Sequence, residues 1–143
     1  MPFRLIDSSV WIAYLRPKPD PRIVEAVRRA LAAGEAAIAA PIVIEVLSGI
    51  RDSREYAARE ADFRAIPRLD TGGEASYIAA RIGRALVEKG KRGTTVDLHL
   101  AGAAIETGAE LWSLPDDHFD DIRSLLKKGD VKVQGPFLLR WLP

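Results

Sequence analysis

Four acidic residues lie at the edges of apolar segments that are far apart in this sequence. Asp7 directly follows a short apolar run, Glu45 lies inside a second, Asp97 precedes a third and Asp116 comes soon after a fourth. No local motif explains a set spaced so widely, so only tertiary folding would bring these side chains together. Carboxylates gathered in this way suit Mg²⁺ or Mn²⁺, because both cations take oxygen ligands. The four acids are therefore candidate metal ligands.

Each acid also has a purely structural explanation, and the residues alone leave both open. Asp7 and Asp97 would serve as helix N-caps and Asp116 as a turn residue, because aspartate is favoured at such positions without any ligand. Glu45 is harder to explain in this way, since it lies between two large aliphatic residues of a strongly apolar helix. A carboxylate in such a setting is costly unless it is paired or bound to a metal.

The elements that must position these acids alternate between strands and helices. Strands are expected near residues 3–7, 36–40, 66–69, 110–114 and 131–133. Helices are expected near residues 9–16, between Asp20 and Gly34, near 42–50 and 54–64, from the turn at 70–72 to Gly90, and near 97–108 and 119–126. This alternation predicts an α/β fold with a central parallel sheet flanked by helices. Asp7, at the end of the first strand, then lies where open α/β sheets place their sites.

Composition narrows the class of protein. A chain of 143 residues with 48% hydrophobic and 29% charged residues suits one globular domain, here residues 1–143. No apolar run approaches the roughly 20 residues that cross a bilayer, and the first residues lack the pattern of a signal peptide, so we expect a soluble, cytoplasmic protein without membrane contact. The absence of cysteine excludes a disulfide framework and a thiol nucleophile, and two histidines make zinc chemistry unfavourable.

The net charge of +1 hides a local asymmetry. Residues 81–92 are mainly basic, whereas residues 106–121 contain six acids and neither lysine nor arginine. An acidic region beside a basic one suits a metal site that must also hold a polyanion. The alternative is that both are ordinary solvated faces, and charge alone does not decide between them.

Four segments carry a resemblance to a known family. They are residues 5–12 (LIDSSVWI), 41–51 (PIVIEVLSGIR), 96–104 (VDLHLAGAA) and 111–119 (LWSLPDDHF). Together they resemble, in the family's order, the motifs of PIN-domain ribonucleases, specifically VapC-type toxins of type II toxin–antitoxin pairs. The resemblance implies one PIN domain with three α/β/α layers and a parallel sheet of about four to five strands.

The resemblance assigns catalytic and metal-binding roles to Asp7, Glu45, Asp97 and Asp116. The last assignment departs from the usual pattern, in which a Thr or Ser is followed by one residue and then the acid. Here Pro115 pushes the acid one place along, which leaves Asp117 as an alternate ligand.

Four further groups are compared with the family in the same way. Ser9, two residues after Asp7, resembles the hydroxyl partner of a ligand, and Ser113 is expected to act similarly. His118 falls where the family often places Asp or His, and is a candidate neighbour of the metal. His99 is expected to lie on the other side of its helix.

The resemblance also implies an activity. Carboxylates around one or two Mg²⁺ or Mn²⁺ ions would support hydrolysis of phosphodiester bonds in structured RNA, leaving a 5′-phosphate and a 3′-hydroxyl. Basic side chains would position the RNA phosphates without selecting a sequence. The candidates for this role are Arg81, Arg84, Lys91 and Arg92. Whether the target is transfer RNA or ribosomal RNA stays open.

The implied partners are a cognate VapB-like antitoxin and a second copy of the chain. Toxins of this family are usually homodimers, and they enter larger toxin–antitoxin assemblies. Apolar residues near the first and third helices are candidates for the antitoxin groove or the dimer interface. They are Trp11, Ile12, Ile42, Val46 and Leu47.

Three other kinds of protein compete with a nuclease. A haloacid-dehalogenase-like phosphotransferase also has an Asp after its first strand, but Asp7 is not followed by a second Asp two residues later. A phosphoacceptor receiver would carry its Asp near the middle of the chain, where Glu45 does not fit. A non-catalytic PIN module that binds RNA or protein is the third possibility, and the presence of all four acids argues against it.

Overall fold

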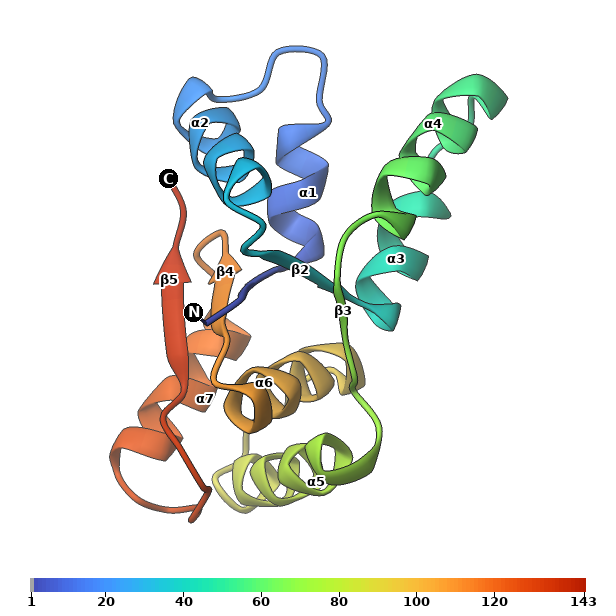
Figure 1. Ribbon diagram of the computed structural model, residues 1–143. Helices are drawn as coiled ribbons and strands as arrows, with labels where there is room; N and C mark the ends of the chain where they lie inside the picture. The colour runs from blue at the N-terminus through green and yellow to red at the C-terminus, as the bar shows by residue number, and fades with distance from the viewer. Residues whose placement is uncertain (1) are drawn as a thin grey trace.

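A single parallel sheet of five strands organises the chain, and the computed structural model describes residues 2–143. The strands are β1 (Arg4–Ile6), β2 (Ala36–Ala39), β3 (Arg68–Leu69), β4 (Glu110–Ser113) and β5 (Leu138–Trp141). Their order across the sheet is β3-β2-β1-β4-β5, so the first strand lies at the centre (Figure 1). The predicted parallel sheet is confirmed.

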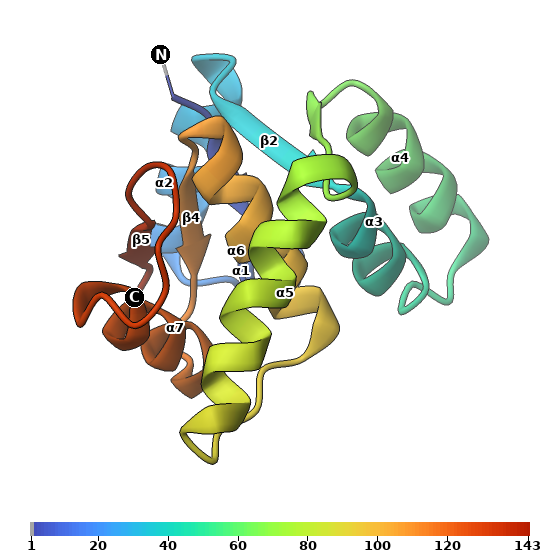
Figure 2. The same ribbon diagram turned by 90° about the horizontal axis from the view of Figure 1, so that it is seen from below.

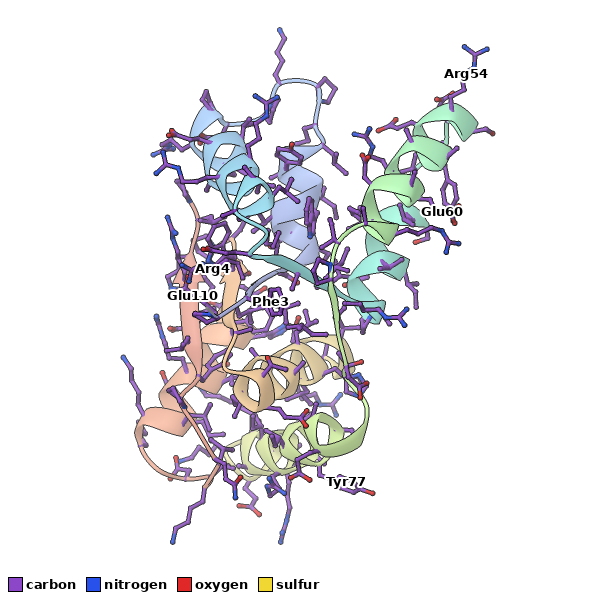
Figure 3. The ribbon with its side chains drawn as sticks, in the orientation of Figure 1. Phe3, Arg4, Arg54, Glu60, Tyr77 and Glu110 are labelled. Atoms are coloured by element: carbon purple, nitrogen blue, oxygen red, sulfur yellow. The ribbon has the colours of Figure 1, made fainter. Side chains whose placement is uncertain are left out.

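The central strands are apolar because both faces of the sheet are covered. Leu5 of β1 is opposite Ala37 of β2 on one side and Leu111 of β4 on the other, and all three are fully buried. At the starts of β1 and β4, Arg4 donates to Glu110 over 3.0 Å (Figure 3). The amino ends of the two strands are thereby joined by an ion pair.

Seven helices are arranged around the sheet of residues 2–143. They are α1 (Ser8–Tyr14), α2 (Pro21–Ala32), α3 (Ala40–Leu47), α4 (Ser53–Arg64), α5 (Gly73–Glu88), α6 (Thr95–Thr107) and α7 (Asp117–Lys127). Helices α1 and α2 cover one face, α5, α6 and α7 the other, and α3 with α4 project beyond the β3 edge (Figure 1). This is the three-layer α/β/α arrangement. None of these helices is long and apolar enough to span a membrane.

Local sequence signals explain most helix ends. Asp20 caps α2 by accepting a hydrogen bond from the Arg22 N–H at 2.9 Å, and Pro21 follows at the first helical position. Gly34, with φ of 70°, lies just beyond the end of the helix, where a left-handed residue is needed. Both signals had been expected at these positions.

Helices α5 and α6 lie side by side across one face (Figure 2). A Cβ at Gly102 would come within 2.3 Å of the Ala75 carbonyl oxygen, so only glycine allows this approach. Gly102 therefore admits the neighbouring helix, which packs on the outer side of α6.

The prediction of a final strand at residues 131–133 was wrong. These residues form an irregular connection after α7, and the fifth strand is β5, which pairs through Leu139 with Leu111. The Val-Lys-Val alternation has strand character, but a strand requires a partner. After Gly129 the chain must first cross from the end of α7 to the open edge of β4, and residues 131–137 form this crossing.

Candidate metal centre

Asp7 lies at the carboxyl end of the central strand. Its backbone N–H donates to the Trp112 carbonyl over 2.9 Å, which continues the pairing between β1 and β4. The side chain caps α1: Oδ2 accepts from the Ser9 N–H at 3.3 Å and from the Ser9 hydroxyl at 2.7 Å. Only 7% of the residue is exposed. Asp7 is therefore a helix cap, and it is also a buried carboxylate at the expected edge of the sheet.

The two predicted hydroxyl partners both lie beside Asp7. Ser9 donates to its carboxylate and accepts from the Leu114 N–H over 3.2 Å, so it joins the start of α1 to the end of β4. Ser113 Oγ lies 3.4 Å from Asp7 Oδ2 but only 2.8 Å from the Leu114 carbonyl, to which its hydroxyl donates. Ser9 is thus the principal hydroxyl donor to Asp7.

Glu45 is exposed, which contradicts the expectation of a buried carboxylate. Helix α3 buries Ile42, Val46 and Leu47, and it turns Glu45 and Ile44 toward solvent. The apolar residues of α3 therefore lie on its buried and on its exposed face. Because Glu45 is exposed, its charge carries no burial cost that a metal would have to offset. Glu45 is nevertheless joined to the site.

Ser8 connects Glu45 with Asp7. The Ser8 hydroxyl donates to Glu45 Oε1 over 3.1 Å, and it lies 3.5 Å from Asp7 Oδ1. Sequence reasoning missed this residue. The available signal was a hydroxyl side chain in the first helical position immediately after the strand-end acid.

Asp97 lies in the first turn of α6, but it is not the cap. Thr94 caps this helix by accepting from the Asp97 N–H over 3.0 Å, which leaves the Asp97 side chain free for another role. Its Oδ2 lies 3.0 Å from Nδ1 of His118 on α7. The N-cap interpretation of Asp97 was therefore wrong by three positions.

Asp116 is the N-cap of α7. Its Oδ1 accepts from the His118 N–H at 2.7 Å and from the Phe119 N–H at 3.2 Å. Asp117, the alternate ligand, begins the helix and is exposed, and its carboxylate accepts no hydrogen bond within residues 2–143. One oxygen each of Asp97 and Asp116 and one ring nitrogen of His118 lie within 4.8 Å of one another. This favours Asp116 over Asp117 as the fourth acid.

Asp7, Asp97 and Asp116 are close enough for their charges to act on one another. Burial is the main cause that raises the pKa of Asp7, opposed by the Ser9 hydrogen bonds and reinforced by the negative charge of Asp116. Burial also raises the pKa of Asp97, where hydrogen bonds from His118 and Thr94 oppose it and the charges of Asp7 and Asp116 add to it. A cation would relieve both the repulsion and the desolvation.

The four carboxylates share one pattern of hydrogen bonding. Each has one oxygen held by a protein donor: Asp7 Oδ2, Glu45 Oε1, Asp97 Oδ2 and Asp116 Oδ1. Within residues 2–143 the second oxygen of Glu45, Asp97 and Asp116 accepts no hydrogen bond, and Asp7 Oδ1 has only the Ser8 hydroxyl at 3.5 Å. Anchored carboxylates with a second oxygen to spare are a donor set that fits Mg²⁺ or Mn²⁺.

The predicted phosphate contacts fall into two groups. Arg81 and Arg84 are on α5 and pair with acids of the same helix, Glu74 and Glu88, each over 3.6 Å. Lys91 and Arg92 lie in the link between α5 and α6, just before the turn that carries Asp97. Lys91 donates to Asp121 of α7 over 2.8 Å, and this contact raises the pKa of Lys91.

Most of the apolar residues proposed for the groove or dimer interface belong to the core instead. Trp11, Ile42, Val46 and Leu47 are each at most 5% exposed. Trp11, for example, packs edge-on against Phe63 with ring centroids 5.2 Å apart. Of the five candidates only Ile12 is exposed, because the core of this small sheet needs the others.

The three-layer α/β/α fold and the acids at the carboxyl edge of its sheet agree with one protein family. The sequence profile of the PIN domain matches residues 4–125, which include all four acids. The chain belongs to the PIN-domain family.

The curated relatives place it more narrowly, among the VapC-type proteins. It is 33% identical over 111 residues to the VapC ribonuclease Mb1587 of Mycobacterium bovis and equally to ribonuclease VapC11 of Mycobacterium tuberculosis. Each alignment covers 75% of this chain and 82% of the relative.

Solved structures share the fold across nearly the whole chain. VapBC from Salmonella typhimurium, bound to DNA, has a TM-score of 0.69 at 21% identity, covering 98% of both chains. VapBC-1 from nontypeable Haemophilus influenzae has a TM-score of 0.71 at 15% identity, covering 97% of both. FitAcB from Neisseria gonorrhoeae has a TM-score of 0.67 at 17% identity, covering 84% of this chain and 93% of the other.

Proposed function

We propose that this protein is a metal-dependent endoribonuclease that hydrolyses phosphodiester bonds in structured RNA and acts as the toxin of a toxin–antitoxin pair. The observation that carries the proposal is the set of four anchored carboxylates at the carboxyl edge of the sheet, none paired with lysine or arginine within residues 2–143. The names of the curated relatives support the ribonuclease activity.

The proposed ligands are Asp7, Glu45, Asp97 and Asp116. When bound, Mg²⁺ or Mn²⁺ supplies an activated water as nucleophile and neutralises charge on the scissile phosphate. The protein's part is to hold the acids in place: Ser9 fixes Asp7, Ser8 joins it to Glu45, and the first turn of α7 fixes Asp116.

The RNA strand must approach a strongly negative surface, and the link between α5 and α6, which leads into the first turn of α6, offers countercharge. Lys91 and Arg92 are both exposed there, and Lys91 is already drawn to α7 by Asp121. We infer that these two side chains contact phosphates flanking the cut. Arg81 and Arg84 are weaker candidates because they lie within α5, whereas Lys91 and Arg92 lie in the link that leads into the first turn of α6, which carries Asp97.

RNA cleavage with defined variants tests the activity. Purified protein with Mg²⁺ or Mn²⁺ should cut a pool of structured cellular RNA, and EDTA should stop the reaction. Asp7→Asn and Asp97→Asn should each reduce cleavage by at least about 10³-fold without unfolding the protein. Sequencing of the new 5′ ends identifies the target, and undiminished cleavage by both variants would refute the proposal.

An antitoxin partner is part of the same proposal. One solved neighbour, VapBC-5 from Mycobacterium tuberculosis, is described as a member of the VapBC family of toxin–antitoxin systems. In this chain a groove of about 770 Å³ lies between α3 and α4. Ile44, 66% exposed, and Tyr56 supply apolar surface there, and Arg64 and Arg68 border it. We propose that a VapB-like antitoxin occupies this groove, with two copies of the toxin in the complex.

Co-purification tests the partner. The protein encoded beside this gene should co-elute with the wild-type chain and inhibit RNA cleavage, and Ile44→Glu should weaken the complex by at least tenfold. Tyr77→Glu, a change of an exposed residue on α5 outside the groove, is the matched control (Figure 3). Equal binding by the Ile44 variant would move the partner to another surface, and light scattering of the complex gives the number of toxin copies.

A further inference from the structure

His118 connects the two helices that carry Asp97 and Asp116. It is in the first turn of α7, and its Nδ1 lies 3.0 Å from Oδ2 of Asp97 on α6. The Asp97 side chain is 16% exposed, whereas the imidazole is 43% exposed. The ring therefore closes one side of a mostly covered carboxylate.

Asp97 differs from the other acids in how it is held. Asp7 and Asp116 are helix caps, so residues of their own first turns hold them. Asp97 is three positions past its cap, and its closest donor comes from a different helix.

The backbone of His118 has a second task. Its N–H donates to Asp116 Oδ1 over 2.7 Å, which fixes the residue in the first turn of α7. The backbone of His118 is therefore hydrogen-bonded to Asp116, while its ring contacts Asp97. A single residue thus relates the positions of Asp97 and Asp116.

We propose that His118 is a positioning residue of the metal centre: its Nδ1–H holds Asp97 Oδ2, its backbone N–H holds Asp116, and the two contacts set the distance between these ligands. This inference rests on the proposed function, because it assigns His118 a task toward the same cation. Hydrogen bonds to metal ligands commonly change metal affinity by 10–100-fold.

Direct coordination is the competing role for the same ring. The ligand atoms of Asp97, Asp116 and His118 are close enough to share an ion. The two roles require different chemistry. Positioning needs an N–H at the position of Nδ1, which an asparagine amide also supplies, whereas coordination by His118 places an imidazole nitrogen on the ion, where its ¹⁴N coupling to Mn²⁺ is measurable.

The test compares His118→Phe, which keeps a ring but has no donor, with His118→Asn, which keeps a donor. His99→Asn is the matched control, because His99 is the only other histidine of the sequence and its ring forms no hydrogen bond or ion pair with the four acids within residues 2–143. Mn²⁺ affinity is measured from the free-ion signal in electron paramagnetic resonance, and RNA cleavage gives kcat and KM. His118→Phe should weaken Mn²⁺ binding and lower kcat about tenfold with little change in KM. His118→Asn should stay within about threefold of wild type.

Three results would overturn the inference. They are wild-type Mn²⁺ affinity in His118→Phe, an equal defect in His118→Asn, and ¹⁴N coupling from a coordinated imidazole in pulsed spectra of the Mn²⁺-bound wild type. Circular dichroism establishes that each variant folds, and His118→Ala replaces the Phe variant if that one does not. Wild-type protein that cleaves RNA but binds no Mn²⁺ would remove the metal requirement of the proposed function together with the inference. If the wild type binds Mn²⁺ and cleaves RNA, and His118→Phe does both equally well, the inference alone is refuted and the proposed function stands.

Discussion

Acids lie at both ends of the strands β1 and β4, but within residues 2–143 only those at the amino ends are paired with a lysine or arginine side chain. At the amino ends, Arg4 pairs with Glu110 over 3.0 Å and with Glu35 over 3.5 Å. At the carboxyl ends, Asp7 and its neighbours have no lysine or arginine partner within residues 2–143, although burial raises the pKa of Asp7. One end is neutralised by the fold itself, whereas the other retains negative charge that only an added cation would neutralise.

The difference is what the proposed metal site predicts, because such a site gives up stability for ligand binding. A set of acids without countercharge destabilises the folded state, and proteins keep such arrangements mainly at sites that bind a ligand. The paired end costs nothing of this kind. Four predictions test the contrast, from the largest expected effect to the smallest.

Metal binding should stabilise the wild-type protein, and this effect should depend on the acids at the carboxyl ends of β1 and β4 and not on the ion pair at their amino ends. Saturating Mn²⁺ at 100 times its dissociation constant adds about 2.7 kcal/mol to the free energy of unfolding. The melting temperature should therefore rise by several degrees, and EDTA should reverse the rise. Asp7→Asn should lose this response, whereas Glu110→Gln should keep it. Differential scanning fluorimetry measures the melting temperature of each variant. An equal rise with Mn²⁺ in both variants would contradict the proposed difference between the two ends of the strands.

Removing the hydroxyl that holds Asp7 should impair catalysis more than folding. Ser9→Ala deletes the 2.7 Å hydrogen bond to Asp7 Oδ2 and the acceptor of the Leu114 N–H. We expect kcat for RNA cleavage to fall about tenfold or more. Ser9→Thr keeps the hydroxyl and is the control. If the alanine variant matched the threonine variant in kcat, Ser9 would have only a structural role.

Breaking the ion pair at the amino end should change stability and leave activity intact. Glu110→Gln removes the charge that faces Arg4, while the amide oxygen still accepts from Trp112 Nε1, now 2.7 Å from the carboxylate. The half-buried pair contributes about 1 kcal/mol, so the free energy of unfolding measured in urea should fall by that amount. Cleavage should remain within about twofold of wild type. A large loss of activity would show that the two ends are coupled.

Asp7→Asn should stabilise the metal-free protein at neutral pH. Because burial raises the folded-state pKa of Asp7 above its ordinary value of 3.8, the folded protein binds a proton that the unfolded chain has released. Stability therefore falls as pH rises through this window, and the penalty persists at pH 7. The asparagine variant avoids the penalty, so its advantage in EDTA should be present at pH 7 and shrink toward pH 3.8. A less stable variant at pH 7 would contradict this sign.

Local patterns in the sequence predicted most elements of the fold. Asp20 and Gly34 bounded α2 before any tertiary information was needed. The strand prediction failed at residues 131–133, because strand propensity does not say which segment reaches the open edge of the sheet. Helix α3 was predicted correctly, yet the exposure of Glu45 was not, since an apolar helix can cover two neighbours and still keep one open face.

What the sequence determined by itself was the set of candidate acids and, for two of them, the strand ends that carry them. Asp7 and Asp116 follow strands, and parallel strands bring their carboxyl ends to one edge. Only the tertiary structure decided which donors hold these acids: Ser8 reaches Glu45 from α1, and His118 reaches Asp97 from α7. The physical reason is that strand periodicity is local, whereas a hydrogen bond between two helices depends on how closely and at what angle they pack.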